Sequence, residues 1–154
     1  MRPLMTAAIA LSLVLAVGPH AFAGCDQTDP TVAGQVKTAR SNADSACGGC
    51  AAATNHGAYV SCIAGQVKGM DSTALPPQCR GAVVRCAARS TCGKPGFVTC
   101  CRTRADGRTK CSTKNGSDHC VEPPGGTACV GNFPSCCDAC TTTGCATTTT
   151  TTIP

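Results

Sequence analysis

The sequence predicts a small disulfide-rich α+β protein, in which short N-terminal helices are stapled to a C-terminal cysteine-rich β-hairpin unit. Three observations lead to this fold class: 16 cysteines in 154 residues, helical periodicity in three segments between residues 30 and 90, and turn signals between alternating residues from 96 to 120. Aromatic residues make up only 3% of the chain. Because aromatic side chains bury much of a core's apolar area, we expect disulfides to supply the missing stability.

The first 23 residues have the features of an export signal that is removed from the mature protein. Arg2 precedes an apolar run from Leu4 to Val17, and Ala21-Phe22-Ala23 forms an A-x-A cleavage site. The run is too short to span a bilayer. We therefore expect cleavage before Gly24 and a soluble, secreted or periplasmic product without a transmembrane segment.

An alternative interpretation is a lipoprotein signal, in which Ala23-Gly24-Cys25 is processed and Cys25 carries a lipid anchor. Two observations count against it. The break at Gly18-Pro19-His20 leaves room for an ordinary cleavage region, and a lipid on Cys25 would leave an odd number of cysteines. An even number of cysteines in an exported chain favours a disulfide framework.

Three helices are expected in residues 24–93. Asp29 and Pro30 begin the first as N-cap and first helical residue, which is typical of helix starts. The second follows Asn55-His56-Gly57, and the third runs from about Pro77 to Ser90, before Gly93 and Pro95. Each segment repeats apolar residues or cysteines every three or four positions.

The cysteines divide into two odd groups. Seven precede residue 94 and nine follow it. If every cysteine pairs within the chain, at least one bridge must join residues 24–93 to the part of the chain that follows them, so the helical half and the β-hairpin half (residues 94–140) are expected to be one covalent unit. The remaining connectivity does not follow from spacing.

One bridge is predicted from turn geometry. Asn115-Gly116 is a strong signal for a two-residue type I′ turn. Pairing outward from this turn places Cys111 opposite Cys120 in a non-hydrogen-bonded pair, where a disulfide can close. The sequence therefore predicts a second hairpin with a Cys111–Cys120 bridge.

The preceding turn decides whether the basic residues share a face. A three-residue loop at Ala105-Asp106-Gly107 aligns Arg104 with Arg108 and Arg102 with Lys110, and places them with Lys114 on one face. A two-residue Asp106-Gly107 turn would break this arrangement. The three-residue loop fits the residue types better, although it sets like charges opposite one another.

After Pro123-Pro124-Gly125-Gly126, residues Thr127 to Val130 are a short strand candidate. The tail from Thr141 to Pro154 is mostly threonine, which buries little apolar surface. We expect it to be disordered or to form a stalk, and the natural chain can continue beyond it.

Candidate chemistry is sparse. Cys47-Gly48-Gly49-Cys50 is a C-x-x-C motif, interpreted as two disulfide half-cystines because no βαβ context surrounds it. Zinc held by this motif with Cys137 and Cys140 is the less favoured alternative, because an exported chain is oxidised. Only His56 and His119 follow the signal, so no catalytic residues, metal or cofactor are predicted.

Two segments, residues 55–62 (NHGAYVSC) and 92–101 (CGKPGFVTCC), carry a resemblance to a known group. They resemble uncharacterised cysteine-rich exported proteins of bacteria, over about residues 55–140. The resemblance implies export and a shared fold, and it brings no assigned activity or site.

These observations favour a non-enzymatic exported module for surface recognition or cell-envelope structure. The chain has 13 Lys and Arg against 8 Asp and Glu, and loss of Arg2 leaves a formal charge of +4. This net charge is too small to indicate that the protein binds nucleic acid. The expected partner is an anionic envelope or protein surface that meets the five basic hairpin residues. A secreted inhibitor or antimicrobial effector is the alternative.

Overall fold

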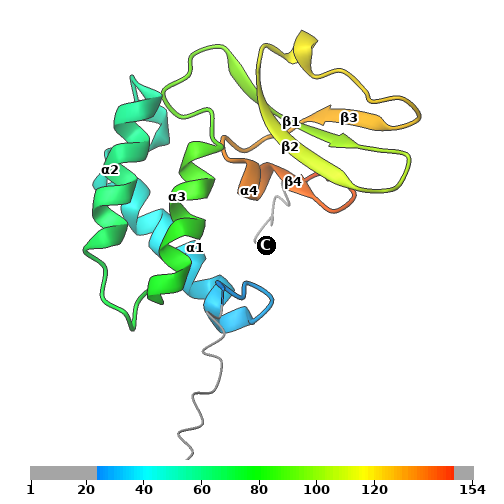
Figure 1. The fold of residues 1–154 in the computed structure, drawn as a ribbon. Helices are drawn as coiled ribbons and strands as arrows, with labels where there is room; N and C mark the ends of the chain where they lie inside the picture. The colour runs from blue at the N-terminus through cyan, green and yellow to red at the C-terminus, as the bar shows by residue number, and fades with distance from the viewer. Residues whose placement is uncertain (1–23, 148–154) are drawn as a thin grey trace, which may run out of the picture.

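The computed structural model describes residues 24–147, which form two halves that differ in structure (Figure 1). The helical half, residues 24–93, contains α1 (Pro30–Ala46), α2 (His56–Lys68) and α3 (Arg80–Ala88), with short 3₁₀ turns at Cys50–Ala52 and Pro77–Cys79. The β half, residues 94–147, holds the strands and the short helix α4 (Cys136–Ala139). The disulfide-rich α+β class is therefore confirmed.

Helix α1 begins at Pro30 as predicted, and α2 begins at His56, within the segment that was expected to precede it. At both starts a polar side chain satisfies the first free backbone N–H groups. Asp29 caps α1, where its carboxylate accepts a hydrogen bond of 2.7 Å from the backbone N–H of Thr31. Asn55 caps α2 by accepting one of 2.9 Å from the N–H of Ala58. The third predicted helix is also present, as the Pro77–Cys79 turn followed by α3.

The three helices pack around a small aliphatic core. Val67, Leu75 and Val83 are each at most 1% exposed, and Tyr59 is the largest side chain at its edge. All members of this core lie in the helical half. Alanine and cysteine fill the remaining space, in agreement with the low aromatic content.

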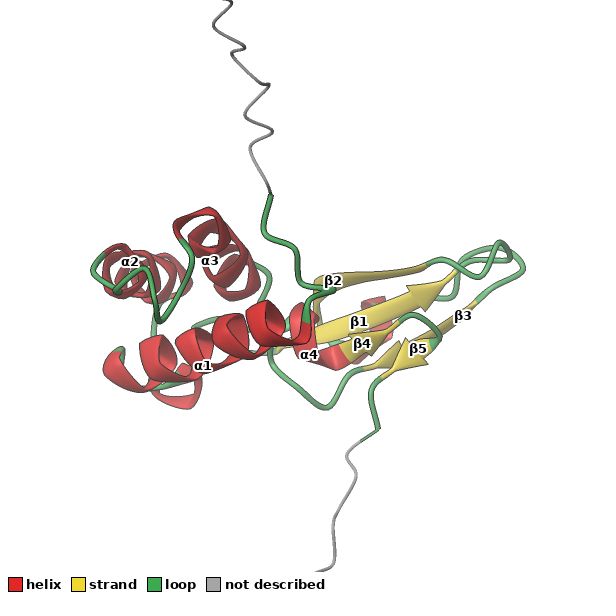
Figure 2. Cartoon of the chain, turned by 90° about the horizontal axis from the view of Figure 1, so that it is seen from below, coloured by secondary structure: helices red, strands yellow, loops and turns green. Residues whose placement is uncertain are grey.

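The β half is built on a three-stranded antiparallel sheet in the order β2-β1-β3. Its strands are β1 (Phe97–Thr103), β2 (Thr109–Asn115) and β3 (Thr127–Val130), the last at the predicted position. Helix α4 and the small β4–β5 pair (Cys140–Thr141 and Gly144–Cys145) lie on one side of this sheet, toward the helices (Figure 2).

The first hairpin has the predicted three-residue loop. The backbone N–H of Arg104 donates to the carbonyl oxygen of Arg108 at 3.1 Å, and Gly107 has φ of +76°. Glycine adopts this left-handed conformation without the steric cost that a side chain brings. The register then pairs Arg102 with Lys110, as expected.

The predicted second hairpin is wrong. A type I′ turn needs positive φ at both central residues, but among the described residues only glycines have positive φ, so Asn115 does not adopt it. Asn115 instead ends β2, and Gly116, with φ of +93°, leads into a 3₁₀ turn at Ser117–His119. The chain then crosses β1 to form β3 on the other edge of the sheet.

The prediction of a disordered tail beginning at Thr141 is wrong for its first residues. Thr141 pairs with Gly144 between β4 and β5, and Cys145 is bonded to Cys129. The ordered β half therefore extends past the predicted boundary at residue 140, because a disulfide holds the segment. The rest of the threonine tract, from residue 148, and the predicted signal lie outside the described residues.

All 16 cysteines are paired, and the two halves are joined by one bridge, Cys86–Cys137, as the odd counts require. Cys25 is bonded to Cys79, a bridge that its thiol cannot form if it carries the lipid considered as an alternative. Within residues 24–147, no helix has the length and apolar character needed to cross a membrane.

Candidate functional site

Five cationic side chains share one face of the β1–β2 hairpin. Side chains alternate between the two faces of a strand, so residues of equal parity in paired strands lie together. The register pairs Arg102 with Lys110 and Val98 with Lys114, and the loop sets Arg104 opposite Arg108. We name this surface the basic face; it comprises Arg102, Arg104, Arg108, Lys110 and Lys114.

The basic face keeps most of its charge available to solvent. Arg104, Arg108 and Lys110 are exposed near the hairpin tip, whereas Arg102 and Lys114 are half-buried. Within residues 24–147, Arg108 alone of the five has an acidic partner, Asp106 at 3.9 Å, and both of these side chains are solvent-exposed. A pair of this kind contributes little attraction in water, so the face is a cationic surface.

The Cys111–Cys120 bridge predicted from the second hairpin does not form. Cys120 is bonded to Cys100, and Cys111 is bonded to Cys136. Cys100 pairs with Ser112 and therefore lies on the basic side of the sheet, while Cys111 pairs with Cys101 on the opposite side. The segment that crosses between β2 and β3 brings Cys120 to the basic side, where Cys111 is out of reach.

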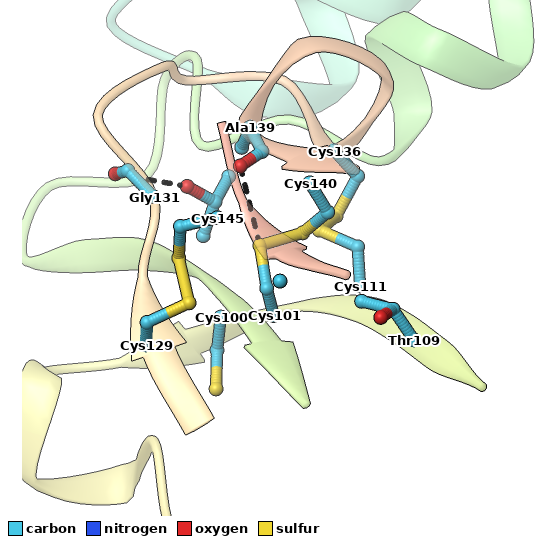
Figure 3. Close-up of a disulfide and its surroundings, with 12 residues drawn as sticks. Cys100, Cys101, Thr109, Cys111, Cys129, Gly131, Cys136, Ala139, Cys140 and Cys145 are labelled. Atoms are coloured by element: carbon cyan, nitrogen blue, oxygen red, sulfur yellow. Dashed lines mark hydrogen bonds between the residues drawn. A yellow bond between two sulfur atoms is a disulfide. The ribbon is translucent and has the colours of Figure 1, made fainter. Parts of the chain in front are cut away.

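The opposite side of the sheet carries three neighbouring disulfides (Figure 3). We name it the disulfide face; its bridges are Cys101–Cys140, Cys111–Cys136 and Cys129–Cys145. The Sγ atom of Cys101 also lies 3.3 Å from the carbonyl oxygen of Ala139, a packing contact because a bridged sulfur carries no proton. The bridges tie all three strands of the sheet to α4, β4 and β5.

Sulfur atoms on the disulfide face lie close enough to surround a metal ion. Those of Cys101, Cys129 and Cys145 form one such group, and those of Cys101, Cys111 and Cys140 form another, with all distances within each group below 4.8 Å. Metal ligation by cysteine requires thiolates. Because all five sulfurs are in bridges, this arrangement is a cross-linked core.

The C-x-x-C motif is occupied by two separate bridges, as expected. Cys47 is bonded to Cys62, and Cys50 is bonded to Cys92. Cys137 and Cys140, the other pair considered for zinc, are bonded to Cys86 and Cys101. The four residues of the zinc alternative therefore belong to four different disulfides.

The two histidines that follow the predicted signal lie in different halves of the fold. His56 is the first residue of α2, and its ring nitrogens lie 2.9 Å and 3.2 Å from the carbonyl oxygens of Cys92 and Ala88. These contacts attach the start of α2 to the end of α3. His119 is exposed in the Ser117–His119 turn, 3.6 Å from the carboxylate of Asp118.

A further site that sequence reasoning missed is a cleft of about 250 Å³ where the two halves meet. We name it the junction cleft. Its floor is apolar and comes from α2 and α3, including Ile63, Val83 and Ala87. One wall is a face of α1, and the other is the segment 134–138 of the β half.

Two polar pairs frame the junction cleft. Arg40 on α1 makes a bidentate ion pair with Asp138 on α4, and one of its two contacts measures 3.0 Å. Deeper in the cleft, the hydroxyl of Tyr59 donates a hydrogen bond of 2.7 Å to the Asp44 carboxylate. Burial and this hydrogen bond raise the pKa of Tyr59 far above its ordinary value.

One wall of this cleft could be recognised from the sequence, and the other could not. Lys37, Arg40, Ser41 and Asp44 recur at the spacing of one helix face, so a polar stripe on α1 can be read from the sequence. Arg40 and Asp138, however, are separated by 98 residues. Their pairing depends on how the halves dock, and no local pattern indicates it.

Comparisons of the chain with protein-family models, with curated proteins and with solved structures found no match. The resemblance to exported cysteine-rich bacterial proteins therefore stays a prediction. Any functional argument depends on the geometry of the basic face and of the junction cleft.

Proposed function

We propose that this chain is an exported, non-enzymatic recognition module that binds an anionic surface through its basic face. The observation that carries the proposal is the placement of all five cationic side chains on one side of a hairpin. An envelope polymer or an acidic protein surface has the matching charge. Export is part of the proposal and is supported by the eight disulfides, which form and persist in oxidising compartments.

Rigidity of the sheet favours recognition by a fixed surface. Binding costs conformational entropy when the interacting groups must be ordered, and a preorganised scaffold lowers that cost. The Cys100–Cys120 bridge holds the crossing segment against the basic side, and three further bridges tie the other side to the C-terminal elements. The basic side chains therefore project from a backbone that is already held in position.

Like charges at the hairpin tip support the same proposal. Arg104 faces Arg108 across the loop, and Arg102 faces Lys110 across the strands. Such pairs repel one another and destabilise a hairpin slightly. An anionic partner relieves this repulsion, so part of its binding free energy comes from a strain that is present in the free protein.

The experiment is a salt-dependent binding assay on immobilised heparin, used as a general polyanion. Charge reversal at two exposed tip residues, Arg104→Glu with Lys110→Glu, is expected to weaken binding at low salt by at least about tenfold, since reversal replaces attraction by repulsion. The salt concentration that elutes the protein should fall accordingly, because exposed charges are screened by salt.

The matched control reverses one arginine and one lysine in the helical half, Arg85→Glu with Lys68→Glu. Both residues are exposed, and neither forms an ion pair within residues 24–147. The two double variants have the same net charge, so a specific basic face requires a much smaller loss in the control. Equal elution of both variants would show that only net charge matters and would overturn the proposal.

A further inference from the structure

The junction cleft has the composition of a small-molecule site that is separate from the basic face. Ligand sites combine an apolar lining with a few polar groups, and they are frequent where two structural units meet. The cleft lies between the helical half and the β half, and its floor includes the buried side chains of Ile63, Val83 and Ala87. Nothing in the proposed function uses it.

The charges around the cleft are balanced, but two of them are already engaged. Lys37, Arg40, Asp44 and Asp138 all line it. Arg40 and Asp138 neutralise each other in their bidentate pair. The charges that a ligand can meet are therefore Lys37 and Asp44, one of each sign.

Both remaining groups have spare binding capacity. Lys37 is exposed and makes no ion pair within residues 24–147. One carboxylate oxygen of Asp44 accepts the hydroxyl of Tyr59, and the other accepts no hydrogen bond from a described residue. The cleft is thus lined by a free cation and by a carboxylate with one free oxygen, beside an apolar floor.

The distance between the two groups limits the size of the ligand. Lys37 and Asp44 are two helical turns apart on the same face of α1, which corresponds to about 10 Å along the axis. The lysine side chain can reach part of this distance. A ligand with its two charges several ångströms apart then spans the remainder.

We propose that the junction cleft binds a dipeptide-sized zwitterion with apolar side chains. Its carboxylate meets Lys37, its ammonium group meets the free oxygen of Asp44, and a side chain packs on the apolar floor near Ile63 and Val83. A simple anion would face Asp44, and a simple cation would face Lys37. A ligand that carries both charges avoids both penalties.

The test is calorimetric titration of the oxidised protein with leucyl-leucine and with two blocked forms of it. We expect saturable binding of the free dipeptide. The N-acetylated form lacks the ammonium group and the C-terminal amide lacks the carboxylate, so each is expected to bind about tenfold more weakly, the usual effect of losing a hydrogen bond to a charged group.

Two variants test which protein group binds each end of the dipeptide. Lys37→Gln should lower the affinity for the free dipeptide about tenfold and leave the affinity for the C-terminal amide unchanged, because that ligand has no carboxylate that could contact Lys37. Asp44→Asn preserves the acceptor for Tyr59, and it should weaken the free dipeptide without changing the affinity of the N-acetylated form. Lys68→Gln, an exposed lysine on α2 outside the cleft, is the control.

Three outcomes would overturn the inference. The first is that the free dipeptide does not bind at millimolar concentrations, and the second is that both blocked forms bind as tightly as the free dipeptide. The third is that Lys37→Gln lowers the affinity for the amide as much as the affinity for the free dipeptide. The Lys37 variant changes only an exposed side chain, so the test stands even if Asp44→Asn does not fold. Heparin binding by the basic face is independent of each result.

Discussion

In the helical half the buried side chains are mainly those of valine, isoleucine, leucine and alanine, whereas in the β half they are cysteines and small residues. The hydrophobic core, which includes Ile63 and Leu75, lies wholly between residues 36 and 92. No valine, leucine, isoleucine or phenylalanine is buried in residues 94–147. There the buried residues are Thr99, Cys100, Cys101, Ser135, Cys136 and Ala139.

The two halves are therefore stabilised by different means. Burial of aliphatic side chains contributes about 1.5 to 3 kcal/mol for each fully buried residue, and the helical half has several. The β half substitutes covalent bonds for this term, with four internal bridges and a share in the fifth, Cys86–Cys137. Its sheet holds its shape because its segments are cross-linked.

The largest expected effect is that of complete reduction. Each disulfide contributes about 2 to 4 kcal/mol, so loss of the bridges exceeds the usual net stability of a domain of about 5 to 15 kcal/mol. We expect amide protection in β1, β2 and β3 to vanish, while residual helical protection persists in α1, α2 and α3. Hydrogen exchange followed by mass spectrometry measures both halves at once. Earlier loss of protection in the helices would refute the comparison.

A sharper test removes one bridge from each half with nearly equal loop lengths. Cys50–Cys92 spans 42 residues and Cys101–Cys140 spans 39. Chain entropy therefore predicts about 4 kcal/mol for either bridge. We expect replacement of the Cys101–Cys140 pair by alanines to cost more, because Cys101 is buried where no aliphatic side chain can compensate.

The measurement for this pair is the midpoint of guanidinium unfolding in each double-alanine variant, with the remaining bridges verified by intact mass. Similar midpoints would mean that loop length alone sets the contribution of a disulfide in both halves. The difference between an aliphatic half and a cross-linked half would then have no effect on the free energy of unfolding that a disulfide contributes.

The smallest expected effect is a loss of stability at high pH that originates in the helical half. Tyr59 has a raised pKa because it is buried and hydrogen-bonded to Asp44. The unfolded chain ionises its tyrosine near pH 10, while the folded chain keeps the phenol neutral. The stability from this group is therefore complete below about pH 10 and declines as the pH rises further.

This effect can be observed directly, because Tyr59 is the only tyrosine and the chain has no tryptophan. Tyrosinate absorbance should rise together with unfolding, and Tyr59→Phe should remove the pH dependence. Alkaline damage to disulfides affects both proteins equally, so the difference between them isolates Tyr59. Ionisation of Tyr59 near pH 10 in the folded protein would contradict its buried, hydrogen-bonded position.

Local features of the fold were predictable because their causes are local. Asp29 and Asn55 cap helices through hydrogen bonds to residues two or three positions away. Gly107 marks the loop of the first hairpin, because a left-handed backbone conformation is required there. The alignment of Arg102 with Lys110 then follows from that loop, so the basic face was accessible from the sequence.

The same kind of local argument failed at Asn115-Gly116. A favourable turn dipeptide lowers the free energy of one hairpin only slightly. The competing arrangement pairs β1 with β3 and bonds Cys100 to Cys120 and Cys111 to Cys136. Several long-range interactions outweigh one turn preference, because propensity is a weak prior against tertiary packing.

The start of α1 and the need for at least one bridge between the halves follow from the sequence alone, and the residue types at 105–107 favour the loop that places the basic residues on one face. The identity of this bridge, Cys86–Cys137, and the pairing of Arg40 with Asp138 at the junction cleft become visible only in the folded chain. The two kinds of feature differ in the distance along the chain between the residues that interact. Caps and turns depend on neighbouring residues, whereas a disulfide or an ion pair between remote residues depends on which faces of the two halves are brought together.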